Sequence, residues 1–132
     1  MENRYVLFVF AILIGFAARG WSHHSISAEY DMHSTGTIEG VVTEVWFNNP
    51  HVRYYLAVAD DDGNEVIWNT HGHNPVTLVR TGWMRETIQV GDRVMITGDT
   101  TRDGSPKLFI RKVTLADGRV LVSHPGADNK AR

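Results

Sequence analysis

The chain has 132 residues, enough for one domain, with a formal net charge of −2 and no cysteine. The lack of cysteine excludes disulfides, thiolate metal sites and thiol catalysis. The slightly acidic balance argues against a nucleic-acid partner, because phosphate backbones require a concentrated basic surface.

The first residues have the pattern of an export signal. Arg4 precedes an apolar run over residues 5–18, which has the length of a signal-peptide core and is shorter than the ~20 residues that span a bilayer. The small residues Gly20 and Ser22 place cleavage before His23, or one or two residues earlier. We therefore predict a signal peptide over 1–22, a periplasmic or secreted protein, and no membrane contact after cleavage. A retained membrane anchor is the alternative.

The segment 35–47 is rich in Thr, Val and Ile and predicts a long strand. Its apolar residues change face along the strand, with Ile38 and Val42 on one side and Phe47 on the other. Such a phase shift close to Gly40 indicates a bend or bulge, which a small barrel uses to pass one strand between two sheets.

Residues 52–59 alternate cleanly between apolar and polar side chains, and 65–70 return as a second strand. The polar turn between them contains Gly63 at a position that tolerates positive φ, which predicts a hairpin. A calcium site is not expected in this turn, because the glutamate that completes a calcium-binding loop is missing.

A short helix is predicted next, from the N-cap residue Asn74 and the proline Pro75 to the stop at Gly82. A helix this short is unstable alone, so we expect it to pack on one end of the barrel.

Further strands are predicted at 93–98, 107–115 and 120–122, with a polar loop over 99–106. Three strands, a helix and two more strands is the element order of the OB fold. We therefore predict an all-β protein, a small five- to six-stranded OB-like Greek-key barrel over 35–122, with an N-terminal arm at 23–34 and a flexible tail at 123–132. An SH3-like barrel or an open antiparallel sheet is the alternative.

Five short motifs distributed along the chain carry a resemblance. The sequence resembles a family of small exported bacterial proteins known only as a domain of unknown function, and the resemblance implies a periplasmic location and an OB-like barrel. The segment 69–73 is unlike that family. The motifs are His23-His24-Ser25, Asn49-Pro50-His51, Thr81-Gly82-Trp83, Val90-Gly91-Asp92 and the stretch from Val113 to Arg119.

Histidines are the candidate metal ligands. After cleavage, the free α-amino group and the imidazole of His23 or His24 can chelate copper, which prefers nitrogen ligands and tetragonal geometry. His51 stands at the start of a strand, and His71 and His73 can offer zinc two ligands from one side of an extended segment. We expect a transition-metal site among these five histidines, with copper first, through His23 or His24 at the strand junction of His51, and zinc second, through His71 and His73. The alternative is that they are ordinary polar residues and that no metal is bound.

The second hypothesis is a metal-free interaction domain for a periplasmic protein or a glycan. OB barrels bind ligands on the face of strands 2 and 3 through aromatic side chains. Tyr54 and Trp68 are expected in the core, whereas Trp46, Asn49, Arg53 and Tyr55 are the candidate contact residues. No nucleophile elbow, zinc-protease helix or phosphate loop is present in the sequence, so we expect a protein that is not an enzyme.

Overall fold

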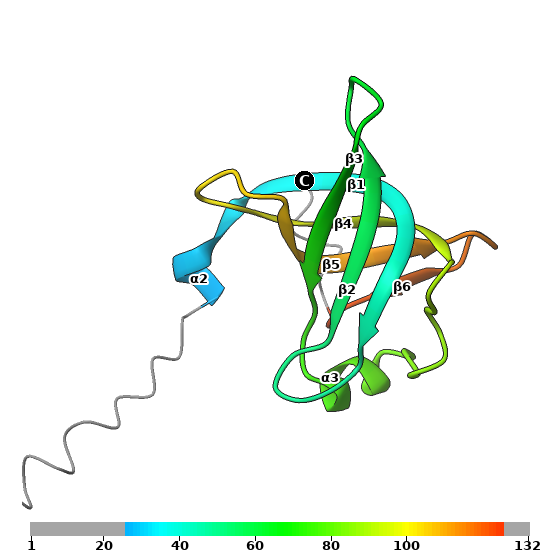
Figure 1. The fold of residues 1–132 in the computed structure, drawn as a ribbon. Helices are drawn as coiled ribbons and strands as arrows, with labels where there is room; N and C mark the ends of the chain where they lie inside the picture. The colour runs from blue at the N-terminus through cyan, green and yellow to red at the C-terminus, as the bar shows by residue number, and fades with distance from the viewer. Residues whose placement is uncertain (1–25, 126–132) are drawn as a thin grey trace, which may run out of the picture.

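Six β-strands and two short helices make up residues 26–125, the part of the chain that this computed structural model describes (Figure 1). In chain order they are α2 (Ile26–Glu29), β1 (Tyr30–Trp46), β2 (Arg53–Ala59), β3 (Glu65–His71), α3 (Pro75–Arg80), β4 (Arg93–Thr101), β5 (Lys107–Leu115) and β6 (Val120–Val122).

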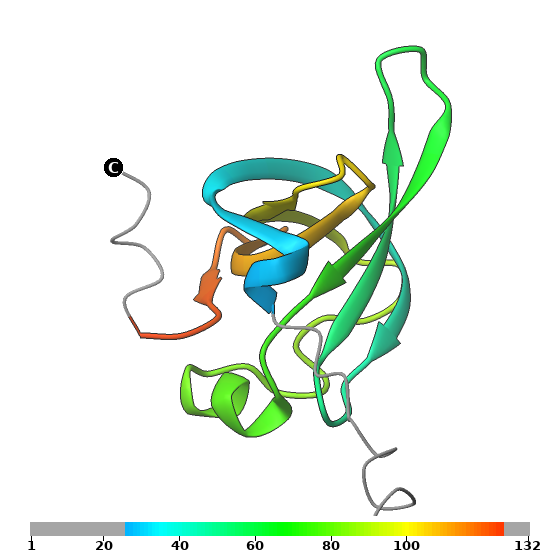
Figure 2. The same ribbon diagram turned by 90° about the vertical axis from the view of Figure 1, so that its left-hand side faces the viewer.

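The strands close into a barrel. Antiparallel pairing gives the order β3-β2-β1-β4-β5-β6, and a short parallel pairing of β3 with β5 closes the first five strands, with β6 added beside β5. This closure is the OB topology, so the predicted OB-like fold is confirmed. The turn end of the β2–β3 hairpin projects beyond the barrel, while the rest of both strands forms part of its wall (Figures 1 and 2).

The long strand β1 bends where the sequence predicts it. Its register with β2 shifts between Val42 and Glu44, which adds one residue to β1. Val42 points inward before this bulge and Phe47 does so after it, with 1% and 5% of their surfaces exposed. The strands also approach closely at Gly40, where a β-carbon would overlap the carbonyl oxygen of Ala57. The absence of a side chain therefore permits the contact that curves the sheet.

Helix α3 covers one end of the core. The Asn74 side chain accepts a hydrogen bond from the Thr77 amide at 2.9 Å, and Gly82 ends the helix at φ +92°. Leu78 is fully buried, and the indole of Trp83 donates to the Val122 carbonyl at 2.8 Å. The predicted helix boundaries and packing are confirmed.

Three segments differ from the predicted boundaries. The first strand begins at Tyr30, so part of the predicted arm is a strand, and β4 continues to Thr101 through the predicted loop. Asp99 lies in that extension and is buried beside Arg111, which explains how a polar segment enters the barrel wall. Ser123, placed in the predicted tail, is fully buried and its amide donates to the Arg111 carbonyl at 2.8 Å.

No helix within 26–125 is long and apolar enough to cross a membrane.

Candidate functional site

Most of the predicted contact residues lie on the outward side of the sheet formed by β1, β2 and β3. Trp46 lies opposite Arg53, which in turn lies opposite His71. One step along the sheet, Glu44 lies opposite Tyr55 and Tyr55 lies opposite Asn69. Side chains opposite each other on one face of a sheet have β-carbons about 4.5–5.5 Å apart, so these two rows form one continuous surface.

Two aromatic side chains and one guanidinium define this surface. Trp46 is 52% exposed, and its indole nitrogen donates to a carboxylate oxygen of Glu44, which holds the ring against rotation. Arg53 and Tyr55 are half-buried, with their neighbours on the sheet covering part of each side chain. Asn49 is exposed in the loop that joins β1 to β2, at the end of the same sheet. We call the outward surface of Trp46, Arg53 and Tyr55 the outer face.

The predicted core aromatics lie on the opposite side. Tyr54 is fully buried and its ring packs against Trp83 at a centroid distance of 6.2 Å. Trp68 is partly buried against the same core. The alternation of β2 therefore separates Tyr54 and Tyr55 as predicted.

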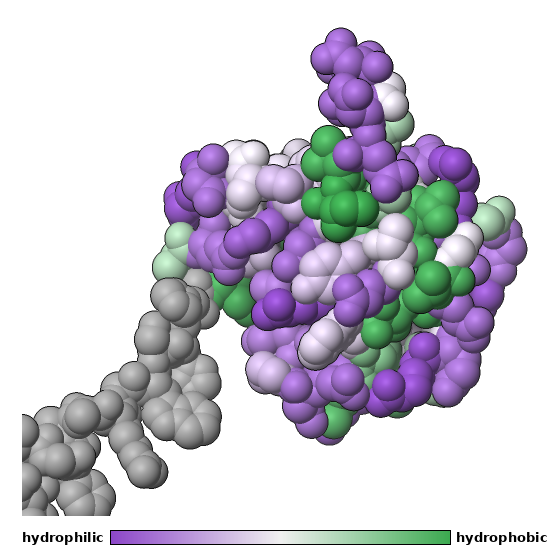
Figure 3. All heavy atoms as spheres, viewed as in Figure 1, coloured by the Kyte–Doolittle hydropathy of each residue, from purple (hydrophilic) through white to green (hydrophobic). Residues whose placement is uncertain are grey.

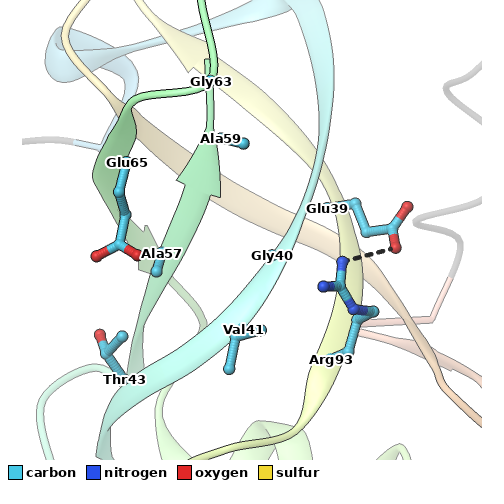
Figure 4. A pocket seen from close by; sticks show the side chains of 9 residues that line it. All are labelled: Glu39, Gly40, Val41, Thr43, Ala57, Ala59, Gly63, Glu65 and Arg93. Atoms are coloured by element: carbon cyan, nitrogen blue, oxygen red, sulfur yellow. Dashed lines mark hydrogen bonds and ion pairs between the residues drawn. The ribbon is translucent and has the colours of Figure 1, made fainter.

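A hollow of about 640 Å³ continues the outer face along β2 (Figure 4). Its floor is made of small side chains and the backbone at Gly40, because Ala57 and Ala59 carry only methyl groups. Arg93 and Glu39 form an exposed ion pair of 3.3 Å on one side, and Glu65 borders the other side. Ala57 is two residues from Tyr55 on the same strand, so the hollow adjoins the aromatic part of the face.

Apolar and polar surface alternate in this view of the molecule (Figure 3). Apolar side chains are exposed over the β2–β3 sheet and are bordered by polar ones, as in a surface that contacts a mixed polar and apolar ligand.

Three of the five predicted histidine ligands gather where β3 ends. His51 donates from Nδ1 to the Gly72 carbonyl at 3.3 Å, which places it beside the segment that joins His71 to His73. The sequence pattern separated these loops, but the twist of the hairpin brings them together. His23 and His24 lie outside the described residues.

His71 is held from several sides. Its Nδ1 shares a hydrogen bond of 3.0 Å with the Tyr30 hydroxyl, whereas its Nε2 is buried without a hydrogen-bond partner among residues 26–125. Burial, and secondarily the positive charge of Arg53, lower the pKa of His71 to about 4. The ring is therefore neutral at pH 7, and it lies in a positive local field.

His73 packs differently. Its ring contacts Phe109 and His124 edge-on, each at a centroid distance of 5.1 Å. Its Nε2 is also buried without a hydrogen-bond partner in the described part of the chain, and burial is the main cause that lowers its pKa. His71 and His73 are thus half-buried.

Four residues of this region were not predicted from the sequence to belong to the site. Tyr30, Glu29, Lys107 and His124 come from the two ends of the described chain and from β5, and only the closed barrel brings them to β3. Lys107 forms an ion pair of 2.8 Å with Glu29, whose helix α2 lies beside the β3–β5 junction (Figure 2). No local pattern marks these residues, because their contacts join positions far apart in the sequence.

Within residues 26–125, no group of three or more histidine, aspartate or glutamate side chains is arranged to hold a metal ion. The candidate site therefore offers a metal at most two ligands from the described residues, His71 and His73.

Acidification provides a test of this arrangement. Between the ordinary histidine pKa of 6.5 and the folded value of about 4, the unfolded chain binds more protons at His71 than the folded chain does. Stability is therefore lost as the pH falls through this window. We expect the free energy of unfolding in urea to drop by about 1–2 kcal/mol between pH 7 and pH 4.5, less than the full shift implies because the ring is partly exposed.

The variant His71→Gln should show a smaller drop, whereas His33→Gln, which changes an exposed histidine, should match the wild type. An equal pH dependence in all three proteins would show that His71 does not titrate in this way.

Comparison with known proteins gives a family and a fold. The model of DUF6152, a family of unknown function, matches residues 11–109. The chain belongs to this family. The predicted resemblance to an uncharacterised family is therefore confirmed. No curated protein matches the chain.

A solved structure also resembles this member of DUF6152. The mitochondrial single-stranded DNA binding protein Rim1 of S. cerevisiae is 19% identical, with a TM-score of 0.49 over 63% of this chain and 93% of that chain. This finding contradicts the prediction that the chain has no nucleic-acid partner. The prediction relied on whole-chain charge, whereas OB barrels bind single strands through local cations and stacking aromatics, which net charge does not report.

Proposed function

We propose that this member of DUF6152 is an exported, non-enzymatic binding module whose outer face binds a glycan. The OB fold is a scaffold for binding, and its strand 2–3 face is a common ligand surface. The observation that carries the proposal is the joint presentation of Trp46, Arg53 and Tyr55 beside a hollow with a floor of small side chains. Docking on another periplasmic protein is the competing outcome.

The chemistry of the face suits sugar rings. Flat aromatic side chains offer apolar surface to the C–H faces of a sugar, while a guanidinium and an amide donate hydrogen bonds to its oxygens. The hollow has the volume of a small-ligand site, and its floor lets a ring approach the backbone. The hydrogen bond from Trp46 to Glu44 favours one orientation of the ring, which reduces the side-chain entropy lost when a ligand covers it.

Export is the remaining part of this proposal. It rests on Arg4, the apolar run over 5–18 and the small residues that follow, all outside the described residues. Cell fractionation followed by N-terminal sequencing tests it. We expect periplasmic protein that begins at His23, or one or two residues earlier. Full-length protein in the membrane would instead establish a retained anchor.

Truncation of the aromatic side chains tests the binding face. A glycan array identifies the bound sugars, and calorimetry then measures the affinity of Trp46→Ala and Tyr55→Ala. We expect each variant to bind about tenfold more weakly, because a buried aromatic contact contributes on the order of 1 kcal/mol beyond its area. Val76→Ala removes an equally exposed apolar residue from α3 and should bind as the wild type does.

Unchanged affinity in both aromatic variants would place the glycan elsewhere. An array without binding, together with a protein complex that Trp46→Ala disrupts, would establish protein docking on this face.

A specific observation favours copper as a second candidate. His71 and His73 flank Gly72, burial lowers the pKa of both imidazoles, and each has a buried Nε2 without a hydrogen-bond partner among the described residues. If Nδ1 of His71 donates to Tyr30, its Nε2 lone pair is free for a metal. The α-amino group of the cleaved chain with His23 or His24 would supply the other ligands. Zinc is the weaker fit, since its tetrahedral geometry needs all four positions filled. Copper ranks second because Arg53 and Lys107 make the field at His71 positive.

Copper titration of the exported form tests this candidate. We expect the affinity to fall at least about tenfold in His71→Gln and in His73→Gln, since each would remove one ligand. His33→Gln serves as the control. Copper binding that only the substitutions at positions 23 and 24 abolish would limit the site to the N-terminus, and wild-type protein that binds no copper would remove this candidate.

A further inference from the structure

One end of the outer face is positively charged. Arg53 lies directly opposite His71, and Lys107 lies opposite Asn69, the next outward residue of β3. The positive charges of Arg53 and Lys107 both lower the pKa of His71, which shows that their fields overlap at this imidazole. Two cations, on β2 and β5, therefore lie near the His71 imidazole at this end of the face.

Unsatisfied polar atoms lie in the same place. Nε2 of His71 and Oδ1 of Asn69 are both buried, and neither has a hydrogen-bond partner within residues 26–125. The Asn69 oxygen can only accept, so it would face a hydroxyl group of the ligand and not its carboxylate. A phenol donates a hydrogen bond readily, and when Tyr30 donates to Nδ1 of His71 the ring carries its proton on Nε2. Nε2 is then a donor that a bound oxygen can satisfy. Such buried, unpaired groups are costly unless a ligand or water completes them.

The chain supplies its own carboxylate to this charged end. Glu29, the last residue of α2, forms the 2.8 Å ion pair with Lys107, and both side chains are about one-third exposed. The negative charge of Glu29 also raises the pKa of His71, which places it within the same field. The backbone of Glu29 is held by the Arg102 amide, which donates to its carbonyl at 3.1 Å, so only the partly exposed side chain of Glu29 has to move when the ion pair opens.

We propose that the ligand of the outer face is an acidic oligosaccharide, and that a uronic acid carboxylate binds in the field of Arg53 and Lys107 by displacing Glu29. This inference rests on the proposed glycan-binding function and assigns its ligand class. The sugar rings then contact Tyr55, Trp46 and the hollow, while the carboxylate accepts paired hydrogen bonds from the guanidinium. The Glu29 carboxylate competes with the ligand for these cations and so lowers the affinity of the outer face for an acidic sugar.

The position of the aromatic side chains selects a sugar acid over other carboxylates. Tyr55 is two residues from Arg53 on one strand, and Trp46 is directly opposite Arg53. A uronic acid carries its carboxylate on the sugar ring itself. One sugar residue can therefore stack on an aromatic side chain and present its carboxylate to Arg53. Three acidic side chains lie away from Lys107, with Glu44 beside Trp46 and Glu39 and Glu65 at the hollow, so the uncharged hydroxyl groups of the sugars would bind there and the carboxylate would not.

Binding of defined oligosaccharides to the exported form of the chain tests this inference. The probe is an oligosaccharide of four neutral sugars that carries a single terminal uronic acid, and its matched control is the methyl ester of the same oligomer, which has the same rings without charge. We expect the acid to bind about tenfold tighter than the ester, as charge-assisted hydrogen bonds are roughly twice as strong as neutral ones. A single-stranded DNA oligomer and a polyglutamate peptide are measured alongside.

Charge variants locate the carboxylate. Arg53→Gln should weaken the binding of the acid about tenfold and leave the binding of the ester unchanged. Glu29→Gln should tighten the binding of the acid about threefold, since the competing carboxylate is lost from a partly exposed pair. Arg80→Gln makes the same change of charge on α3 and should have no effect.

The outcomes separate the two proposals. If acid and ester bind equally and Trp46→Ala weakens both, the face binds glycans and the acidic class is wrong. If neither oligomer binds, or if only the DNA or the peptide does, the acidic-glycan inference is overturned. Weaker or unchanged binding in Glu29→Gln overturns the role of Glu29 as a competitor.

Discussion

The substitution Gly40→Ala is expected to lower the free energy of unfolding by about 3 kcal/mol, the upper range for inserting atoms into a packed site. A β-carbon at this position would overlap the Ala57 carbonyl oxygen and lie 2.9 Å from a methyl group of Val58. The Ala57 carbonyl is backbone of the neighbouring strand, so it cannot rotate away as a side chain does. Relief requires the β1–β2 pair to separate at the bend, which weakens the barrel wall.

Gly72→Ala is the matched control for this prediction. Gly72 does not have a positive φ, and its nearest neighbour would be a methyl group of Leu78 at 3.4 Å, an ordinary contact. Urea denaturation of both variants at pH 7 measures the difference. Equal unfolding midpoints would mean that β1 and β2 can separate at Gly40 without cost, and that the bend does not depend on a glycine.

Gly40 also shows how far the sequence predicts this fold. The shift of apolar phase along β1 predicts the bend, because inward residues must be apolar on both sides of it. The extra residue, however, is Thr43, three positions later than the glycine. A bulge only requires that the register shift somewhere between two inward residues. Its position depends on the partner strand, which the sequence of β1 does not contain.

The helix α3 was predictable because its position does not depend on a distant part of the chain. Its signals are local: the Asn74 side chain caps the helix through a residue three positions away, and Gly82 ends it through its own φ. Contacts of this range are encoded in adjacent residues. The same is true of the hairpin at Gly63, with φ +82°.

The candidate site was predictable only in part. Alternation along β2 assigned Arg53 and Tyr55 to the outside, since strand period depends on neighbours alone. The partners of His71 were not predictable, because Tyr30 is 41 residues away and reaches it only after the barrel closes. The Glu29–Lys107 pair spans 78 residues, and neither residue belongs to a recognisable motif.

The buried ion pair between β4 and β5 is the second feature whose disruption is expected to cost much stability. Arg111 donates from Nε to Asp99 at 2.7 Å and from Nη2 to the Met32 carbonyl at 3.0 Å. The two side chains are only 7% and 2% exposed. The guanidinium therefore joins three strands, and it fixes the first part of β1, which carries Tyr30 to His71.

Asp99→Asn keeps the shape of the side chain but leaves the charge of Arg111 buried without a counter-charge. We expect the free energy of unfolding to fall by about 3 kcal/mol, as for other buried pairs that lose one partner. The exposed pair of Arg93 and Glu39 provides the control, because its side chains are 64% and 51% exposed. Glu39→Gln should change stability by no more than about 0.5 kcal/mol.

A double variant separates charge from packing. Asp99→Leu combined with Arg111→Met removes both charges and keeps apolar volume, so it should recover most of the stability lost in Asp99→Asn, since apolar replacement of a whole buried pair is often neutral. The chemical shift of Tyr30, measured by NMR, should then report whether β1 still reaches His71. A double variant as unstable as Asp99→Asn would mean that the hydrogen bonds of Arg111 to Met32, and not the cancelled charge, hold this part of β1 to the barrel.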